Sequence, residues 1–365
     1  YGAWGIRLAQ PSPGAAPTVL ARLVPPAAME PLSRPAASEL ASRIVARLER
    51  ELAPPPDAAS LPEGAADTFR RTGLRGTYLV PADLNEPVVA PAADQAFVAW
   101  ALAQVAGTPG FDGALRAAPG PAAADPAPAS FLAALDGVLA RLAAPASLAS
   151  LRAPERAHVL AALAARIAAG SAVADRAATA SAIDALWADT RPAQMVAIAP
   201  WLMQADRFLG RETPPVVARD AVDAARTVVL GTQVRADPSR PPSLADEAGA
   251  FPVTGSAAGR ISSQSCRVQA FNAARSGDPA RPARGERAAE TAARGWGNRF
   301  IAQLCVGAAQ ATFAPRPDLA DGGILASTAD ASMPPAAQGL ALWALAASER
   351  AQERLDALDS AAGTR

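Results

Sequence analysis

The sequence predicts a mainly α-helical protein, and three observations lead to this prediction. About a quarter of the 365 residues are Ala, and every basic side-chain charge other than that of histidine is carried by Arg, because Lys is absent. Ala and Arg are strong helix formers, whereas the strand-favouring residues Val, Ile, Thr and Tyr are comparatively scarce. The third observation is a series of amphipathic segments separated by Pro-rich connectors, because proline stops one helix and delays the next.

The first amphipathic segment, 38–52, shows the pattern clearly. It places Leu40, Ile44 and Leu48 on one face and charged residues such as Arg43 opposite. About eleven further helices are predicted in the same way, at 63–71, 92–106, 129–143, 154–169, 177–188, 193–209, 216–230, 262–275, 286–305, 335–347 and 349–361. These helices predict one domain over residues 36–365.

Residues 1–35 differ from the rest of the chain. They are rich in Pro and Gly and show no sustained helical period, so we expect an extended arm that packs on the helical body through residues such as Trp4 and Ile6. The chain begins at Tyr1 rather than Met, which is consistent with a cleaved signal peptide and hence with a periplasmic or extracellular protein.

Charge and composition exclude several classes of function. The formal net charge is zero, which argues against a nucleic-acid binder. The absence of Lys excludes a P-loop and Schiff-base chemistry, so no cofactor is expected, and the only histidine, His158, has no neighbours at metal-ligand spacing. The most apolar stretch, 131–151, is interrupted by Asp136, Arg141 and Pro145, so no transmembrane segment is expected.

An internal repeat organises the predicted helices. A small Gly-containing triplet ending in a large residue opens a polar loop, and a Gln follows near the start of the next helix. Such a Gln can hydrogen-bond to the loop backbone. The three clear copies are Gly76-Thr77-Tyr78 with Gln95, Gly249-Ala250-Phe251 with Gln269, and Gly322-Gly323-Ile324 with Gln338. We therefore expect Gln95, Gln269 and Gln338 to anchor loops at the same end of the molecule.

This pattern of helical hairpins, with a Gly-containing loop and then Gln-x-x-Ala, resembles the α/α toroids of squalene-cyclase-like proteins, prenyltransferase β subunits and some polysaccharide lyases and glycosidases. The resemblance implies a ring of about six hairpins in which inner and outer helices alternate. The inner helices would start near 38, 92, 154, 193, 262 and 335. The alternative fold is an irregular α-solenoid.

The chain lacks the catalytic residues expected of these enzymes. It has no Asp-x-Asp-Asp motif and few aromatic residues. We therefore expect a secreted or periplasmic, non-catalytic scaffold that binds a protein partner. The alternative is a polysaccharide lyase or glycoside hydrolase that binds a glycan.

The enzyme hypothesis depends on charged residues at one mouth of the ring, where paired carboxylates can act as acid and base. The simpler alternative is that Asp94 and Asp330 favour helix starts and the others are solvated loop charges. The candidate catalytic residues are Asp83, Glu86, Asp94, Arg260 and Asp330.

The two cysteines, Cys266 and Cys305, predict a disulfide bond. They lie near the start of one predicted helix and the end of the next, and an antiparallel hairpin brings those ends together. A bridge closing about 40 residues would contribute up to about 4 kcal/mol in the chain-entropy estimate. The alternative is a pair of buried, inert thiols.

Overall fold

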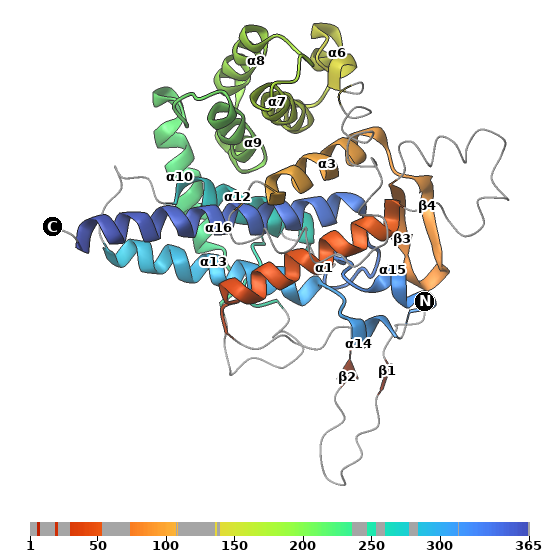
Figure 1. The fold of residues 1–365 in the computed structure, drawn as a ribbon. Coiled ribbons are helices and arrows are strands. Elements are labelled where there is room, and N and C mark those ends of the chain that lie inside the picture. Colours follow the sequence, from red (N-terminus) through yellow and green to blue (C-terminus); the bar gives the residue numbers. More distant parts are fainter. Residues whose placement is uncertain are drawn as a thin grey trace.

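The structure is a computed structural model that describes residues 6–7, 19–20, 30–52, 74–106, 108, 136, 139–235, 247–252, 260–276, 284–312 and 314–363. This part of the chain is mostly helical, which confirms the predicted helical class (Figure 1). The helices are α1 (Arg34–Leu52), α3 (Ala92–Ala106), α6 (Pro145–Ser150), α7 (Ala153–Ala168), α8 (Arg176–Asp189), α9 (Met195–Phe208), α10 (Arg219–Gly231), α12 (Ser262–Arg275), α13 (Arg284–Leu304), α14 (Ala308–Ala311), α15 (Pro317–Ala320) and α16 (Pro335–Gly363). Short 3-10 turns are η2 (Val80–Ala82), η3 (Pro192–Gln194) and η4 (Val216–Ala218). None of the helices described is both long and apolar enough to cross a membrane.

Most helix boundaries lie close to those predicted, and one prediction is wrong. The segments at 92–106 and 262–275 coincide with α3 and α12. The two segments expected at 335–347 and 349–361 are a single helix, α16. No Pro or Gly separates them, and the Ser348 hydroxyl donates to the Ala344 carbonyl inside the helix. The segment at 63–71 and most of the one at 129–143 lie outside the described residues.

Strands occur where the sequence predicted a polar loop and an extended arm. β3 (Arg75–Leu79) and β4 (Leu84–Val89) form an antiparallel hairpin in which Tyr78 pairs with Asn85. A side chain at Gly76 would overlap the Pro87 carbonyl on the opposite strand, so glycine is needed for this close approach. In the arm, β1 (Ile6–Arg7) pairs with β2 (Val19–Leu20), and α1 begins at Arg34. The predicted packing of Trp4 lies outside the described residues.

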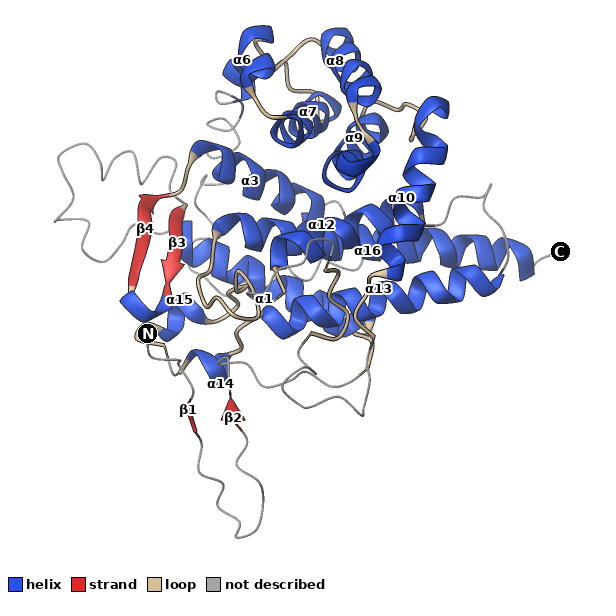
Figure 2. Cartoon of the chain, turned by 180° about the vertical axis from the view of Figure 1, so that it is seen from behind, coloured by secondary structure: helices blue, strands red, loops and turns tan. Residues whose placement is uncertain are grey.

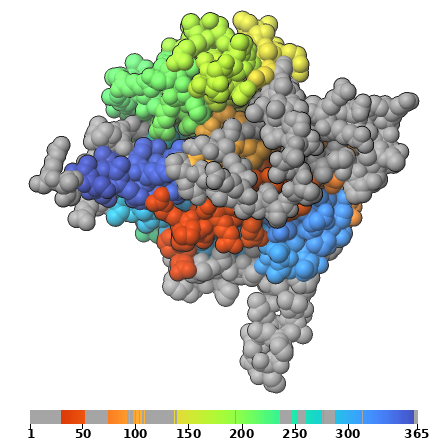
Figure 3. Space-filling model, viewed as in Figure 1, coloured from red at the N-terminus to blue at the C-terminus, as the bar shows by residue number. Residues whose placement is uncertain are grey.

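The helices pack in a regular order. α3 packs against α7, α7 against α9, α9 against α12, and α12 against α16, which in turn packs against α3. A second set of helices, α1, α8, α10 and α13, packs on members of this series. Figures 1 and 2 show α3, α12 and α16 side by side, with α6 to α9 grouped above them. In Figure 3 the α7–α10 group, coloured yellow-green to green, forms a lobe above the blue α16.

The segments before α3, α12 and α16 meet at one end of these helices, which we call the amino end. Tyr78 in β3 forms a bridge with Met333, just before α16, and Ile261, just before α12, forms one with Ser327. Gly322, with φ of 80°, turns the chain against the Arg43 carbonyl on α1. The backbone of the loop that precedes α16 therefore links the starts of all three helices.

The opposite ends meet as well, and we call this region the carboxyl end. Arg350 on α16 donates to the Gln104 carbonyl in the last turn of α3, and Arg354 donates to the Ala273 carbonyl in the last turn of α12. Gln204, near the end of α9, donates to the Gln104 side chain at 3.0 Å. These contacts show that α3, α9, α12 and the first half of α16 share one direction.

Candidate functional site

Asp83 and Glu86, two of the predicted catalytic acids, lie on the β3–β4 hairpin. Asp83 occupies the turn, with φ of 51°, and its Oδ1 accepts hydrogen bonds from Arg316 at 2.7 Å and from the Tyr78 hydroxyl at 3.1 Å. The guanidinium of Arg316 also lies over the Tyr78 ring. Glu86 is exposed. Asp83 is therefore part of an ion pair that fastens the hairpin to the segment before α15.

The remaining predicted residues have separate surroundings. Asp94 lies half-buried in the first turn of α3, where burial raises its pKa, and within the described residues its carboxylate has no hydrogen-bond partner. Arg260 pairs with Glu247 at 3.0 Å. Asp330 accepts a hydrogen bond from the Ser332 amide within its own turn. The amino end thus gathers these segments, but the contacts described at Asp83, Asp94 and Asp330 do not join one carboxylate to another.

Two of the three repeat glutamines, Gln269 and Gln338, have different environments. Gln338 has the contacts expected of a loop anchor, because its amide accepts from the Ile324 N–H at 2.9 Å and donates to the Ile324 carbonyl at 3.0 Å. Gln269 instead donates to the Arg294 carbonyl and to Ser348, more than two turns along α16 from Gln338. Ser265 takes the anchoring role there, accepting from the Phe251 amide. The side chain of Gln95 lies outside the described residues.

The predicted disulfide is not formed. Cys266 and Cys305 are both buried free thiols. Cys305 is fixed by a backbone bridge to Ile324 and its thiol donates to the Val306 carbonyl. Burial raises the pKa of Cys266 to about 12 and that of Cys305 to about 11. Both therefore behave as the small apolar groups of the alternative hypothesis.

His158 belongs to an aromatic cluster between α3, α7, α9 and α16, which we call the central cluster. Its members are Phe97, Trp100, His158, Trp201 and Trp343. Trp201 stacks on Trp343 with ring centroids 3.8 Å apart, and His158 meets the edge of Trp201 at 3.9 Å. Burial, helped by the charge of Arg267, lowers the pKa of His158 to about 3, so this imidazole is neutral at physiological pH. The His158 side chain keeps some exposure to solvent but packs against the rings of Phe97 and Trp201.

The central cluster is held by packing rather than by hydrogen bonds. In the part of the chain that the structure describes, the Nε1 atoms of Trp100 and Trp201 and the Nε2 atom of His158 are buried and have no hydrogen-bond partner. The three Trp side chains are almost completely buried, with exposed fractions of 3% or less. Offset and edge-to-face ring contacts of this kind stabilise a core by about 0.5–1.5 kcal/mol per pair beyond area burial.

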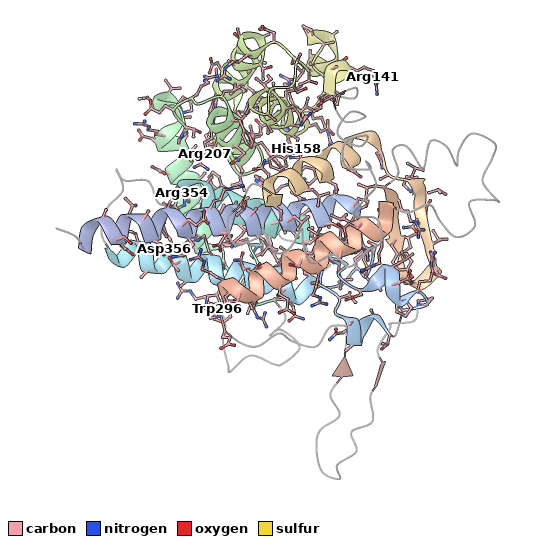
Figure 4. The ribbon with its side chains drawn as sticks, in the orientation of Figure 1. Arg141, His158, Arg207, Trp296, Arg354 and Asp356 are labelled. Atoms are coloured by element: carbon pink, nitrogen blue, oxygen red, sulfur yellow. The ribbon has the colours of Figure 1, made fainter. Side chains whose placement is uncertain are left out.

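A pocket opens at the carboxyl end, next to the central cluster. Three arginines, Arg207 on α9 and Arg350 and Arg354 on α16, line it together with the edge of Trp343 and the small residue Ala347. The space between these side chains, including the part open to solvent, is about 250 Å³. We call this the arginine pocket. Figure 4 labels two of its arginines, Arg207 on α9 and Arg354 on α16. Its remaining lining residues are Pro200, Gln204, Ala270, Ala273 and Ala274.

The three arginines are oriented by the carboxyl ends of helices. Arg207 donates to the Ala274 carbonyl, and Arg354 donates to the carbonyls of Ala273 and Ser276 at 2.9 and 3.0 Å. Arg350 donates to the Thr108 hydroxyl at 3.0 Å as well as to the Gln104 carbonyl at 3.2 Å. The helix dipole places partial negative charge at such carboxyl ends, and the Ala273 carbonyl also accepts a hydrogen bond from the Ser276 amide.

Arg350 and Arg354 lie close enough to each other and to further arginines for their charges to interact. Within the described residues neither Arg350 nor Arg354 forms an ion pair, and the Nη2 atom of Arg350 is buried without an acceptor. Burial, and then repulsion from neighbouring arginines, lowers the pKa of Arg350 and of Arg354 to about 10. Both therefore remain charged at neutral pH. Glu353 is the acidic side chain whose charge favours both of them.

These arginines are not among the site residues predicted from the sequence. Arg350 and Arg354 are four residues apart, which places them on one helix face, and this spacing was a usable signal. Arg207 comes from a different helix, and nothing in the sequence links it to the other two.

Comparisons of the chain with models of known protein families, with characterised proteins and with solved structures found no match.

Proposed function

We propose that the helices form an α/α toroid with five inner helices, α3, α7, α9, α12 and α16, and with α1, α8, α10 and α13 outside them. The packing order supports this arrangement, because each inner helix contacts the next and α16 contacts α3. Gly339 supports the closing contact: a Cβ atom there would lie 2.9 Å from the Phe97 ring and 3.3 Å from Val98. α1, which the sequence predicted as inner, packs on α13, α15 and α16 and is assigned here to the outer set.

Within this fold, the proposed function is that of a non-catalytic scaffold that binds a protein partner. The observation that carries the proposal is the central cluster. In an enzyme built on such a ring, the interior is the place for substrate, whereas here Trp100, Trp201 and Trp343 fill the space between α3, α9 and α16. A filled interior supports a structural role for the ring and leaves its outer surface for recognition.

The alternative, a polysaccharide lyase or glycoside hydrolase, depends on the predicted acids. A pair of carboxylates about 5–10 Å apart is needed for glycoside hydrolysis. Asp83 is engaged by Arg316, and Asp330 by its own turn. Asp94 is the candidate that retains a half-buried carboxylate without a described partner, so it is the position at which the alternative is best tested.

The test combines activity with stability. The protein is incubated with a panel of neutral and anionic polysaccharides, and new reducing ends and unsaturated products are measured for the wild type and for Asp94→Asn. We expect no product from either. Product formed by the wild type and lost in Asp94→Asn would overturn the scaffold proposal.

A second measurement tests the filled interior directly. Trp343→Ala removes the ring that stacks on Trp201, and we expect it to lower the free energy of unfolding by about 3–5 kcal/mol. An interior that exists to hold substrate would tolerate this change with little loss of stability.

A periplasmic or extracellular location stays a prediction. A disulfide would have supported it, because disulfides form in oxidising compartments, but both cysteines are free thiols, so the scaffold proposal is made without a compartment. A glycan partner likewise belongs to the enzyme alternative.

A further inference from the structure

Part of the central cluster is accessible to solvent. Phe97 on α3 and His158 on α7 belong to the cluster (Figure 4), and Arg267 on α12 lies beside it; each occupies the second turn of its helix. All three side chains are half-buried, whereas the Trp201 ring that His158 contacts is almost completely buried. A ligand can therefore reach these three side chains from solvent without entering the filled interior. We call this region the open edge of the cluster.

Arg267 points toward the open edge. One and two turns further along α12, Ala270 and Ala274 line the arginine pocket together with the Trp343 ring, so Arg267 shares the face of α12 that is turned toward α9 and α16. Helical side chains lean toward the start of their helix, which carries the guanidinium away from that pocket and toward the amino end. The charge of Arg267 acts on His158, so these two side chains lie close together.

The guanidinium group of Arg267 has no counter-ion in the described part of the chain. Its Nε atom is buried without an acceptor, and among the described residues no ion pair, hydrogen bond or aromatic ring engages the rest of the group. Burial lowers the pKa of Arg267, and the Cys266 thiol, rather than any described carboxylate, acts in the opposite direction. Arginine stays protonated in proteins, and a charge removed from water without a counter-ion costs stability. Arg267 therefore presents one uncompensated positive charge at the open edge.

We propose that Arg267 binds a single carboxylate group at the open edge, with the His158 and Phe97 rings in contact with the rest of the ligand. One guanidinium matches one carboxylate, because its planar fork donates two parallel hydrogen bonds to the two oxygens. A phosphate carries up to two negative charges, whereas the described side chains of the open edge offer the single charge of Arg267, since His158 is neutral at physiological pH.

The aromatic wall beside Arg267 favours a ligand with an apolar body. The Phe97 and His158 rings stack with centroids 5.7 Å apart, and both keep part of their surface in solvent. A ring or an apolar chain attached to the carboxylate can pack on these rings. The inference goes beyond the scaffold proposal and does not depend on it, because it concerns the open edge rather than the filled interior.

His158 provides a reporter for the test, because it is the only histidine of the chain and its imidazole signals are unique. Benzoate is titrated into the full chain carrying isotope-labelled histidine, at constant ionic strength adjusted with chloride, and the His158 signals are followed by NMR. We expect a saturable shift of these signals and a rise in Tm with benzoate concentration. The absence of a saturable shift would overturn the inference.

Two further probes identify the ligand. N-acetylglutamic acid α-amide carries its carboxylate on an aliphatic side chain. Tighter binding of this probe than of benzoate assigns the site to an acidic side chain of a partner protein, and weaker binding assigns it to a small aromatic acid. Inorganic phosphate is the third probe, and binding of phosphate as tightly as benzoate would overturn the proposed preference for carboxylate and with it the inference.

Variants test Arg267 itself. Arg267→Met removes the charge but keeps an unbranched stem, so we expect the Kd for benzoate to rise by about tenfold or more. Because no partner is lost, the Tm of this variant without ligand should equal or exceed that of the wild type. Arg267→Lys keeps the charge but loses the planar fork, and should raise Kd by severalfold.

The matched control is Arg235→Met, at an exposed arginine, which should bind benzoate as the wild type does. Wild-type affinity in Arg267→Met would overturn the inference. A Tm of Arg267→Met well below that of the wild type would overturn it too, because the guanidinium would then serve the fold.

Discussion

The two ends of the central helices use arginine in opposite ways. At the amino end, Arg47 pairs with Glu51, Arg316 with Asp83, and Arg260 with Glu247, so these three arginines each meet a carboxylate. At the carboxyl end, Arg350 and Arg354 meet backbone carbonyls. Ion pairs therefore join segments at the amino end, whereas hydrogen bonds to helix-end carbonyls join helices at the carboxyl end. This difference predicts that the loss of one charged partner destabilises the amino end more than the carboxyl end.

The largest expected effect concerns a buried ion pair at the amino end. Arg47 and Glu51 are fully buried on α1, and Arg47 also donates to the Leu319 carbonyl before α16. Arg47→Met leaves the Glu51 carboxylate without its main partner, and we expect a loss of about 3–5 kcal/mol in the free energy of unfolding. Urea denaturation measures it.

The control for that variant is the double change Arg47→Met and Glu51→Leu, which removes both charges. It should recover most of the loss, because no uncompensated buried charge remains. A single variant as stable as the wild type would show that the pair does not hold the amino end.

A pH titration gives the next largest effect, at the end of α9. Burial raises the pKa of Asp206 to about 6, although the Trp187 indole N–H and the charge of Arg211 act in the opposite direction. The folded state thus binds this proton more tightly than the unfolded state. Its contribution is complete below about pH 4 and is lost as pH rises through about 6, by about 3 kcal/mol.

Asp206→Asn is the matched variant, since its amide oxygen can still accept from Trp187. Urea denaturation between pH 4 and 8 should show a shallower pH dependence for the variant. Identical profiles for both proteins would contradict the assignment of this titration to Asp206.

A smaller loss is expected when the loop anchor at the amino end is removed. Gln338→Leu leaves the buried N–H and carbonyl of Ile324 without side-chain partners, which should cost about 2 kcal/mol. Gln194, just before α9, is exposed, and Gln194→Leu should change stability by less than about 0.5 kcal/mol. Equal effects at the two positions would argue against a special role for Gln338.

The smallest expected effect belongs to the carboxyl end. Arg350→Gln loses hydrogen bonds at the end of α3 but also removes repulsion with Arg207, so we expect a loss of about 1 kcal/mol. Thermal unfolding at low and high salt tests the role of this repulsion, because salt screens it and should stabilise the wild type more than the variant. A loss as large as that of Arg47→Met would erase the proposed difference between the ends.

The helices themselves could be read from the sequence. Local periodicity and proline positions predicted α3 and α12 to within a residue, because these signals act within one turn of chain. The triplet ending at Ile324 and the following Gln338 also formed a recognisable local pattern. The same pattern around Gly76 led to the wrong prediction of a loop. Gly76 is needed there for a close approach between two strands.

The site residues show where local reasoning ends. Asp83 and Arg260 were predicted as candidate catalytic residues, and their partners, Arg316 and Glu247, lie in segments that no spacing rule connects to them. The disulfide hypothesis failed for a related reason: helix ends that meet in a hairpin do not fix the two sulfur atoms at bonding distance.

By itself, then, the sequence determined the helical class, most helix boundaries and the exclusion of lysine-dependent chemistry. Only the tertiary structure decided that Trp100, Trp201 and Trp343 lie together in one buried cluster and that Arg207, Arg350 and Arg354 line one pocket. The physical reason is the distance along the sequence between the residues that interact. Helix formation depends on residues three or four positions apart, whereas the central cluster and the arginine pocket join residues from α3, α9 and α16, whose positions are set by packing.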